Sequence, residues 1–390
     1  MNFRWRVAAL SSLLLGLTVG LPYYAIAFFY DYWETSYGWS RGAIMLGLPL
    51  GTFVTLILGP LYVRRLSPRH SITGGAVLVA ASLAGFGLMP PNLLVYYGVW
   101  ILYMAGWSFA GPLAHQILLS RLFPEKPGPA LALAYFGISL LGALSVVLLA
   151  RPLTLAYGFP TALLILGGIV MLAVPLAHWG LPATKPDHHA RSKPAPVVRN
   201  RAFWLLLTGT TSSIAGIGGI SQHLKLILRE VNYPNQARLD AVYGLTVMLM
   251  LLTGSAGRFL FAWSINRFPK RAVLSGAFGL MVGSLPLLLV LDWSPDRMPY
   301  LFALLFGLGM SVDSLLLPLV AAEHFGSRSL SAVLAIIVPV NVVGQSWFPS
   351  LMSVLWSATG SYTVPLLVTF AFILAGRFLL AALPAPDVEN

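Results

Sequence analysis

Long apolar runs, separated by short polar or proline-containing segments, recur along the whole chain. A bilayer core about 30 Å thick needs roughly 20 apolar residues per helix, so runs of that length predict membrane-spanning helices. In the first half of the chain, spans are predicted at residues 6–30, 41–63, 71–90, 92–119, 129–150 and 157–182. In the second half, spans are predicted at residues 201–228, 238–265, 270–292, 299–322, 329–352 and 361–383. The pattern therefore predicts an all-α polytopic membrane protein with twelve transmembrane helices.

A polar segment, ATKPDHHARSKPAPVVRN, separates the two sets of spans. We expect an N-terminal six-helix bundle at residues 1–182, a cytoplasmic linker at 183–200 and a C-terminal six-helix bundle at 201–390. Two bundles joined in this way are typical of porters that bind their substrate near the bilayer midplane, between the two halves. The functional residues are therefore expected on the spans.

Charged residues make up only 9% of the chain, against about 25% in soluble domains, although the net charge is +12. With the amino terminus placed inside, 16 of the 24 basic residues fall on the cytoplasmic side, and Arg258 and Arg377 fall within spans. This bias predicts that both termini are cytoplasmic. The basic charge then serves orientation and contact with anionic lipid, and no nucleic acid is expected as a partner. We expect a multi-pass protein of a cell membrane, of the bacterial inner-membrane type.

The amino-terminal residues Met1–Arg6 are basic and run into an apolar stretch longer than the core of a signal peptide, which is about 7–15 residues. We therefore expect the first span to be retained. The chain has no cysteine and shows no clustered metal ligands, no nucleophile with its base and no GxxxxGK(S/T) loop. These features argue against an enzyme or an ATP-driven pump, and we expect no cofactor and no metal site.

The loops after the second and eighth spans resemble each other and read GPLYVRRLSPR and AWSINRFPKR. Both resemble degraded copies of the signature loop of the major facilitator superfamily, in which an acid and an arginine close the cytoplasmic gate. In this chain Val63 and Asn266 replace the acids. The resemblance implies that Arg64 and Arg267 belong to the cytoplasmic gate, although their usual acidic partners are missing.

A more specific resemblance lies in short motifs spread over nearly the whole chain. They include Tyr37-Gly38-Trp39-Ser40-Arg41, Tyr157-Gly158-Phe159, the segment from Glu323 to Arg328, and Thr359-Gly360-Ser361-Tyr362. Together they are similar to the monocarboxylate porters and oxalate/formate antiporters. The resemblance implies a secondary active transporter of small organic anions, most simply a lactate- or pyruvate-like monocarboxylate, which works by alternating access with proton symport.

Arg258 is the main candidate for substrate binding. An arginine at a helix centre costs about 2.5–3.5 kcal/mol on the insertion scale, so a span rarely keeps one without a partner or a purpose. Its guanidinium stays protonated and matches the two oxygens of a carboxylate. In the resembled family an arginine of this span anchors the substrate carboxylate, and it falls on Arg258. The alternative is a structural pair with an acid.

Two positions depart from the resembled family. Gly254 stands one turn before Arg258, where an acid or amide is frequent, and Tyr23 replaces a lysine of the first span. Asp313 is placed near the centre of the tenth span and is the candidate for proton coupling. It either carries the coupled proton or neutralises Arg258 in the empty site, and the alternative is a hydrogen-bonded structural acid.

Polar lining of the site is expected from Tyr23, Tyr24, Asn341 and Gln345, of which the last two are one turn apart on the eleventh span. Hydrogen bonds between helices are the alternative role for each. The eleventh span has no lysine, which favours a singly charged acid over a dicarboxylate.

Five further polar residues have weaker claims to a role in transport. Gate or interfacial roles are expected for His115, His223 and Lys225, whereas Asp31 and Glu34 are expected to be external and solvated.

Several alternatives remain open at this level. They are anion exchange, transport of larger aromatic carboxylates or amino acids, drug efflux, a channel, and a membrane sensor that does not transport. The expected partners are a small monocarboxylate, protons and the lipid bilayer, and the protein is expected to function as a monomer.

Overall fold

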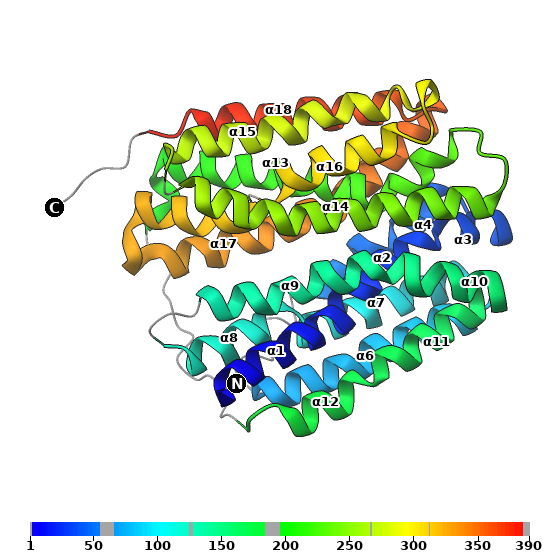
Figure 1. The fold of residues 1–390 in the computed structure, drawn as a ribbon, viewed down its shortest axis with the longest axis horizontal. Coiled ribbons are helices and arrows are strands. Elements are labelled where there is room, and N and C mark those ends of the chain that lie inside the picture. The colour runs from blue at the N-terminus through cyan, green and yellow to red at the C-terminus, as the bar shows by residue number, and fades with distance from the viewer. Residues whose placement is uncertain are drawn as a thin grey trace. The chain divides into compact units, whose positions relative to one another are not determined.

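The computed structural model describes residues 2–54, 66–124, 128–183, 196–265, 267–311 and 313–384. These described residues form helices joined by turns and contain no β-strand (Figure 1). Contacts group the chain into two compact units. The first unit comprises Met1–Ala190 and Pro234–Leu251, and the second comprises Arg191–Tyr233 and Leu252–Asn390.

The first unit begins with a long, locally irregular helical stretch and continues through antiparallel helices. Its elements are α1 Phe3–Leu15, the π-helical η1 Gly16–Gly20, α2 Leu21–Phe28, α3 Tyr30–Tyr37, α4 Arg41–Met45, α6 Pro68–Leu88, α7 Leu93–Ala110, α8 Pro112–Leu122, α9 Gly128–Leu144, the π-helical η2 Ser145–Ala150, α10 Arg151–Tyr157, α11 Phe159–Met171 and α12 Ala173–Gly180.

The second unit contains longer helices. Its elements are η3 Pro196–Arg199, α13 Arg201–Arg229, the later part of α14 Gln236–Ile265, α15 Lys270–Ser284, η4 Leu285–Leu288, η5 Leu291–Trp293, α16 Met298–Met310, α17 Asp313–Thr359 and α18 Thr363–Ala381. The helix α14 is continuous, and its residues up to Leu251 group with the first unit.

Within the described residues, helices overlap each of the twelve predicted spans. In the part of the chain that the structure describes, eight stretches are long and apolar enough to cross a bilayer, namely Phe3–Tyr37, Pro68–Leu88, Leu93–Leu122, Gly128–Tyr157, Phe159–Gly180, Arg201–Arg229, Gln236–Ile265 and Thr363–Ala381. Shorter apolar helices at Arg41–Val54, Ser275–Leu288 and Met298–Met310, together with α17, fall on the other four predicted spans.

The helix boundary between the tenth and eleventh predicted spans differs from the sequence-based expectation. A loop was predicted between the tenth and eleventh spans, at residues 323–328, but α17 continues through it, and the helical break lies instead directly after α16. Glu and Arg are good helix formers, so the polar residues Glu323 and Arg328 do not require the helix to end. The polar residues therefore do not mark the end of a helix, and the prediction of a loop at this place is wrong.

Two of the family-like motifs owe their glycine to backbone geometry. Gly38 and Gly360 have φ of 68° and 70°, in the left-handed region that glycine adopts without a steric penalty. The Gly38 N–H donates to the carbonyl of Glu34 and the Gly360 N–H to that of Trp356, so each residue closes a helix. These motifs therefore have a structural cause in addition to any role in transport.

Close glycine contacts bring helices together in both units. A Cβ on Gly75 of α6 would lie 2.8 Å from the carbonyl oxygen of Gly106 on α7, and a Cβ on Gly106 would lie 2.9 Å from that of Gly75. Gly209 of α13 and Gly376 of α18 form an equivalent pair, at 3.2 and 3.0 Å. Small residues that let helix backbones approach are typical of packing in membranes.

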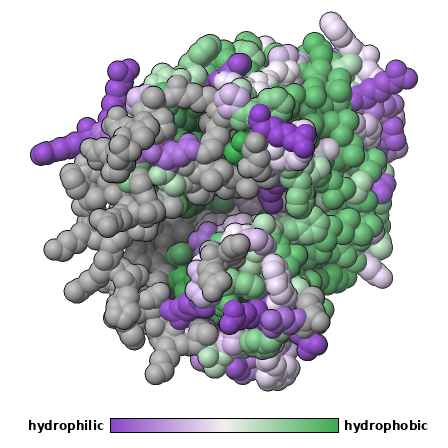
Figure 2. Space-filling model, turned by 60° about the vertical axis from the view of Figure 1, so that its left-hand side comes forward, coloured by the Kyte–Doolittle hydropathy of each residue, from purple (hydrophilic) through white to green (hydrophobic). Residues whose placement is uncertain are grey.

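Large apolar side chains are exposed in both units. Leu94 is 81% exposed, Leu88 71%, Phe259 72% and Phe378 64%. Figure 2 shows broad hydrophobic areas on the described surface. Exposed apolar surface on this scale is typical of helices that face lipid.

Candidate functional site

Arg258 lies on the second-unit part of α14, on the side of the helix that is packed against protein. Phe259 and Trp263 are 72% and 48% exposed, whereas Gly254 and Phe261 are buried. At 3.6 residues per turn, Arg258 is one turn from Gly254 and nearly one turn from Phe261, so it shares their side of the helix. Arg258 is half-buried and its Nε atom is shielded from solvent. The candidate anchor therefore does not belong to the exposed apolar stripe.

Glycines next to Arg258 let α14 approach α16 closely. A Cβ on Gly254 would lie 3.0 Å from Met310 Cε, and a Cβ on Gly257 would lie 2.5 Å from Ser311 Oγ. The hydroxyl of Thr253 also donates to the carbonyl of Ala303, at 3.2 Å. The segment of α14 that carries Arg258 is therefore held against the end of α16.

Asp313 follows this contact directly. Its backbone begins α17, two residues after Ser311, whose hydroxyl donates to the Leu308 carbonyl at 2.7 Å. The side chain of Asp313 lies outside the described part of the structure. The chain segments that carry Arg258 and Asp313 are thus neighbours, because Ser311 contacts the residue before Arg258.

Asn341 and Gln345 both face α13. Thr211 donates a hydrogen bond to Asn341 Oδ1 at 2.7 Å, and Asn341 Nδ2 donates to Thr210 Oγ1 at 3.3 Å. Asn341 is only 3% exposed. One turn on, Gln345 packs on Gly218, where a Cβ would lie 2.7 Å from Gln345 Cγ. The structure therefore gives the Asn341 amide an interhelical hydrogen-bonding role within the second unit.

Tyr23 and Tyr24 belong to the first unit. Both are half-buried on α2, and their rings meet edge to face with centroids 5.2 Å apart. Tyr24 packs against span five, since a Cβ on Gly142 would lie 2.8 Å from Tyr24 Cδ2. The remaining candidates, Arg258, Asn341 and Gln345, belong to the second unit.

Of the two predicted gate residues, Arg64 lies outside the described residues. Arg267 is exposed just after the end of α14, and its guanidinium carbon lies 4.2 Å from the ring centroid of Trp263. This geometry is a cation–π contact.

His223 is fully buried where α13, α17 and α18 meet. Its Nε2 lies 2.8 Å from the carbonyl oxygen of Pro349 and its Nδ1 lies 2.6 Å from the hydroxyl of Tyr362. Because a carbonyl only accepts, Nε2 carries a proton. When the ring is neutral, Nδ1 accepts the hydrogen bond of the Tyr362 hydroxyl. Glu230 accepts from the Trp356 indole at 2.6 Å and from the Tyr362 backbone at 3.2 Å. This network gives a structural role to the tyrosine of the TGSY motif.

His115 and Lys225 are also buried, at 0% and 1% exposure. His115 lies on α8, just after the interruption of the fourth span at Gly111-Pro112. The carbonyl groups before this interruption are covered by hydroxyls from other helices. Ser71 donates to Phe109 at 2.7 Å, and Thr18 is 3.4 Å from the carbonyl oxygen of Ala110.

The expectation that Asp31 is solvated is wrong. Asp31 is only 1% exposed, because the first half of α14 packs beside it and Gln236 donates to its Oδ2 at 2.6 Å. Gln236 also donates to Asp240 Oδ1 at 3.2 Å, and the hydroxyl of Tyr32 donates to Asp240 Oδ2. Sequence reasoning missed this cluster. A signal was present in Asp240, an acid inside the predicted eighth span.

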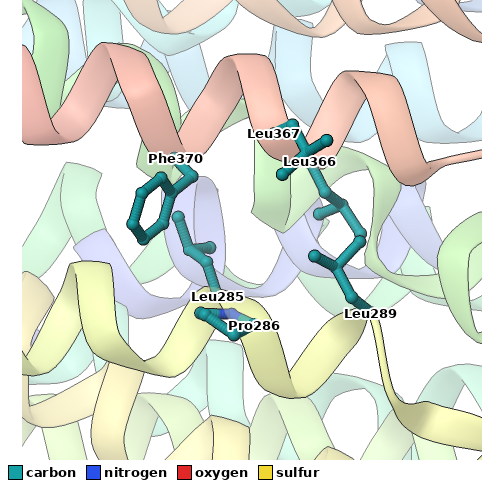
Figure 3. Close-up of a pocket in the computed structure, with 6 residues that line it drawn as sticks. All are labelled: Leu285, Pro286, Leu289, Leu366, Leu367 and Phe370. Carbon is teal, nitrogen blue, oxygen red and sulfur yellow. The ribbon is translucent and has the colours of Figure 1, made fainter.

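An apolar depression lies between η4 and α18, as Figure 3 shows. It is lined by Leu285, Pro286, Leu289, Leu366, Leu367 and Phe370. The lining holds no charged or hydrogen-bonding side chain, so the depression does not suit the negative end of an organic acid. Among the described residues, no group of three or more His, Asp or Glu side chains is arranged to hold a metal ion.

Comparisons with known proteins place this geometry in a family. The model of the Major Facilitator Superfamily matches residues 109–349, more than half of the chain. The solved structures that match include a bacterial homolog of the human lysosomal transporter Spinster, in an inward-facing and unoccupied conformation. It covers 98% of this chain and 97% of its own, with a TM-score of 0.73 and 12% sequence identity, which shows a common fold. No curated protein sequence matches.

These findings confirm the predicted fold class, an all-α polytopic membrane protein with the major facilitator fold. They also agree with a transporter rather than an enzyme. The chain belongs to the Major Facilitator Superfamily.

Proposed function

We propose that the protein is a secondary active transporter of small monocarboxylates, lactate- or pyruvate-like, with Arg258 as the anchor of the carboxylate. One observation carries the proposal: a permanently charged guanidinium lies within a membrane-spanning helix, on its packed side, with Nε shielded from solvent. A charge in such a place is expensive and marks a functional site by default. The planar guanidinium binds a carboxylate through two parallel hydrogen bonds.

Proton symport is the proposed coupling, with Asp313 as the carrier. Support comes from the contact of Gly257 with Ser311. This contact brings the segment of α14 that carries Arg258 close to the start of α17, where Asp313 lies. In the empty site, a carboxylate near the anchor would pair with the Arg258 guanidinium. When the substrate anion takes that place, its negative charge favours the protonated form of the carboxyl, so a proton is taken up together with the anion. The motifs that resemble those of the monocarboxylate porters support the same proposal.

The remaining polar candidates have different strengths within this proposal. Tyr23 and Tyr24 stay candidates for contact with the substrate from the first unit. Asn341 and Gln345 are proposed to act mainly by fixing α17 on α13, because both already contact that helix. The proposed placement is a cell membrane of the bacterial inner-membrane type, with cytoplasmic termini and a functional monomer.

Counterflow of labelled lactate in proteoliposomes tests the proposal. Liposomes preloaded with unlabelled lactate are expected to accumulate label, and Arg258→Gln is expected to lower the initial rate at least about tenfold, since a hydrogen bond to a charged group contributes about 1.5–3 kcal/mol. Arg377→Gln is the matched control. This variant removes the second of the two arginines that the sequence analysis places within spans. Arg377 has no assigned role in transport, so the variant should keep most of the rate.

The alternatives give other results in the same vesicles. An anion exchanger would show counterflow without proton uptake, and a porter of aromatic acids or amino acids would accumulate those labels but not lactate. A sensor would bind ligand without flux. Equal loss of rate in Arg258→Gln and Arg377→Gln would contradict the anchor role of Arg258.

A further inference from the structure

Four side chains join α3 to the first half of α14 within the first unit. Gln236 of α14 donates to Asp31 of α3 at 2.6 Å and to Asp240 of its own helix at 3.2 Å. Tyr32 of α3 donates from its hydroxyl to Asp240. Both acids therefore receive a donor whose position depends on the packing of one helix against the other.

Burial makes these contacts important for the position of α14. Asp31 and Asp240 are 1% and 0% exposed. A buried carboxyl that loses its donor is costly unless water or another donor replaces it. Separation of α3 from the first half of α14 therefore requires water or other donors to replace these contacts.

Apolar packing lies next to the polar contacts. The rings of Phe28 and Tyr243 stack with centroids 6.1 Å apart. A Cβ on Gly244 would lie 3.2 Å from side-chain atoms of both Val146 and Val147, in the π-helical η2. The first half of α14 is thus seated on the first unit, while the residues from Leu252 onward belong to the second unit.

We propose that Asp31, Tyr32, Gln236 and Asp240 form a latch, the α3–α14 latch, which must open and close in each transport cycle. Because α14 is one continuous helix whose two parts group with different units, release of its first half changes the relation of α14 to the first unit. The hydrogen-bond donors of the latch are the amide of Gln236 and the phenol hydroxyl of Tyr32. It rests on the proposed function only in so far as that function requires alternating access.

The absence of native cysteine allows a direct test. Phe28→Cys places a single thiol next to the latch residue Tyr32, whose ring centroid lies 5.5 Å from that of Phe28, at a position that is fully buried. In detergent micelles, where the reagent reaches all surfaces, the rate of maleimide labelling reports how often the latch region opens. Adding Tyr32→Phe and Gln236→Leu removes these two donors and is expected to raise that rate at least about fivefold. Tyr243→Cys is a second reporter in case one thiol disturbs folding.

Glu34→Gln is the control for a change of charge on α3, since Glu34 pairs with Arg41 outside the latch, at 3.2 Å. It should leave the labelling rate unchanged. Equal labelling rates in the latch variant, the control and the parent would overturn the proposal, provided that all three elute as monodisperse protein. The readout needs no substrate. Faster labelling of the latch variant without lactate transport would therefore support the latch and contradict the substrate assignment. Lactate transport with an unchanged labelling rate would support the substrate assignment and contradict the latch.

Discussion

Ser311 Oγ lies 2.5 Å from the point that a Cβ on Gly257 would occupy, so the residue before Arg258 contacts the chain two residues before Asp313. This contact brings the backbone next to the proposed anchor close to the backbone next to the proposed proton carrier. It also explains why glycine stands at position 257.

Gly257→Val is expected to disturb the site without changing any charge. The added side chain would meet Ser311 and also the Leu308 carbonyl, whose oxygen is 2.9 Å from a Cβ at this position. Overpacking of this kind costs about 1–3 kcal/mol. We expect a lower melting temperature in detergent and a reduced transport rate, measured by thermal-shift and counterflow assays. Gly276→Val is the control, because a Cβ there meets no atom within 4 Å.

Asn341→Leu is expected to weaken the contact between α13 and α17. Thr211 loses its acceptor at 2.7 Å, and a hydrogen bond between membrane helices contributes about 0.6 kcal/mol on average, up to about 1.7. Thermal unfolding in detergent measures the loss. Thr211→Val in the same background should add little, because the two changes remove one shared bond. Full additivity would contradict the pairing.

Tyr362→Phe removes the hydroxyl that lies 2.6 Å from His223 Nδ1 and keeps the ring. We expect reduced stability, because the buried imidazole loses its donor, while the backbone N–H of position 362 can still donate to Glu230. The measurement is the melting temperature of purified protein. His223→Phe should produce a larger loss, because it also removes the bond from Nε2 to the Pro349 carbonyl. Adding Tyr362→Phe to His223→Phe should then change the melting temperature little.

Asp313→Asn tests the proposed coupling. If Asp313 carries the proton, the variant loses lactate-driven proton uptake, which an entrapped pH indicator reports, while counterflow that needs no net proton movement continues. Glu323→Gln, which changes the next acid along α17, is the control. Unchanged proton uptake in Asp313→Asn would assign the proton to another group.

The sequence predicts the spans well because a helix in lipid must be long and apolar, and this requirement is local. The helix ends at Gly38 and Gly360 lie beyond the predicted span ends at residues 30 and 352, because an apolar run marks only the part of a helix that lies in lipid. The burial of Asp31 was not visible, because Gln236, which covers it, is 205 positions away in the sequence. The hydrogen bonds of Asn341 and His223 depend in the same way on which faces of distant helices meet.

An equilibrium binding assay tests most directly the claim that the Arg258 guanidinium, on the packed side of α14, holds the carboxylate. The assay measures how well unlabelled lactate, or its neutral amide, displaces bound labelled lactate. It is carried out on the parent protein, on Arg258→Gln and on Arg377→Gln. The account predicts that lactate competes far better than the amide on the parent and on Arg377→Gln, and that this difference disappears in Arg258→Gln. Retention of the same preference for the charged acid in Arg258→Gln would contradict it.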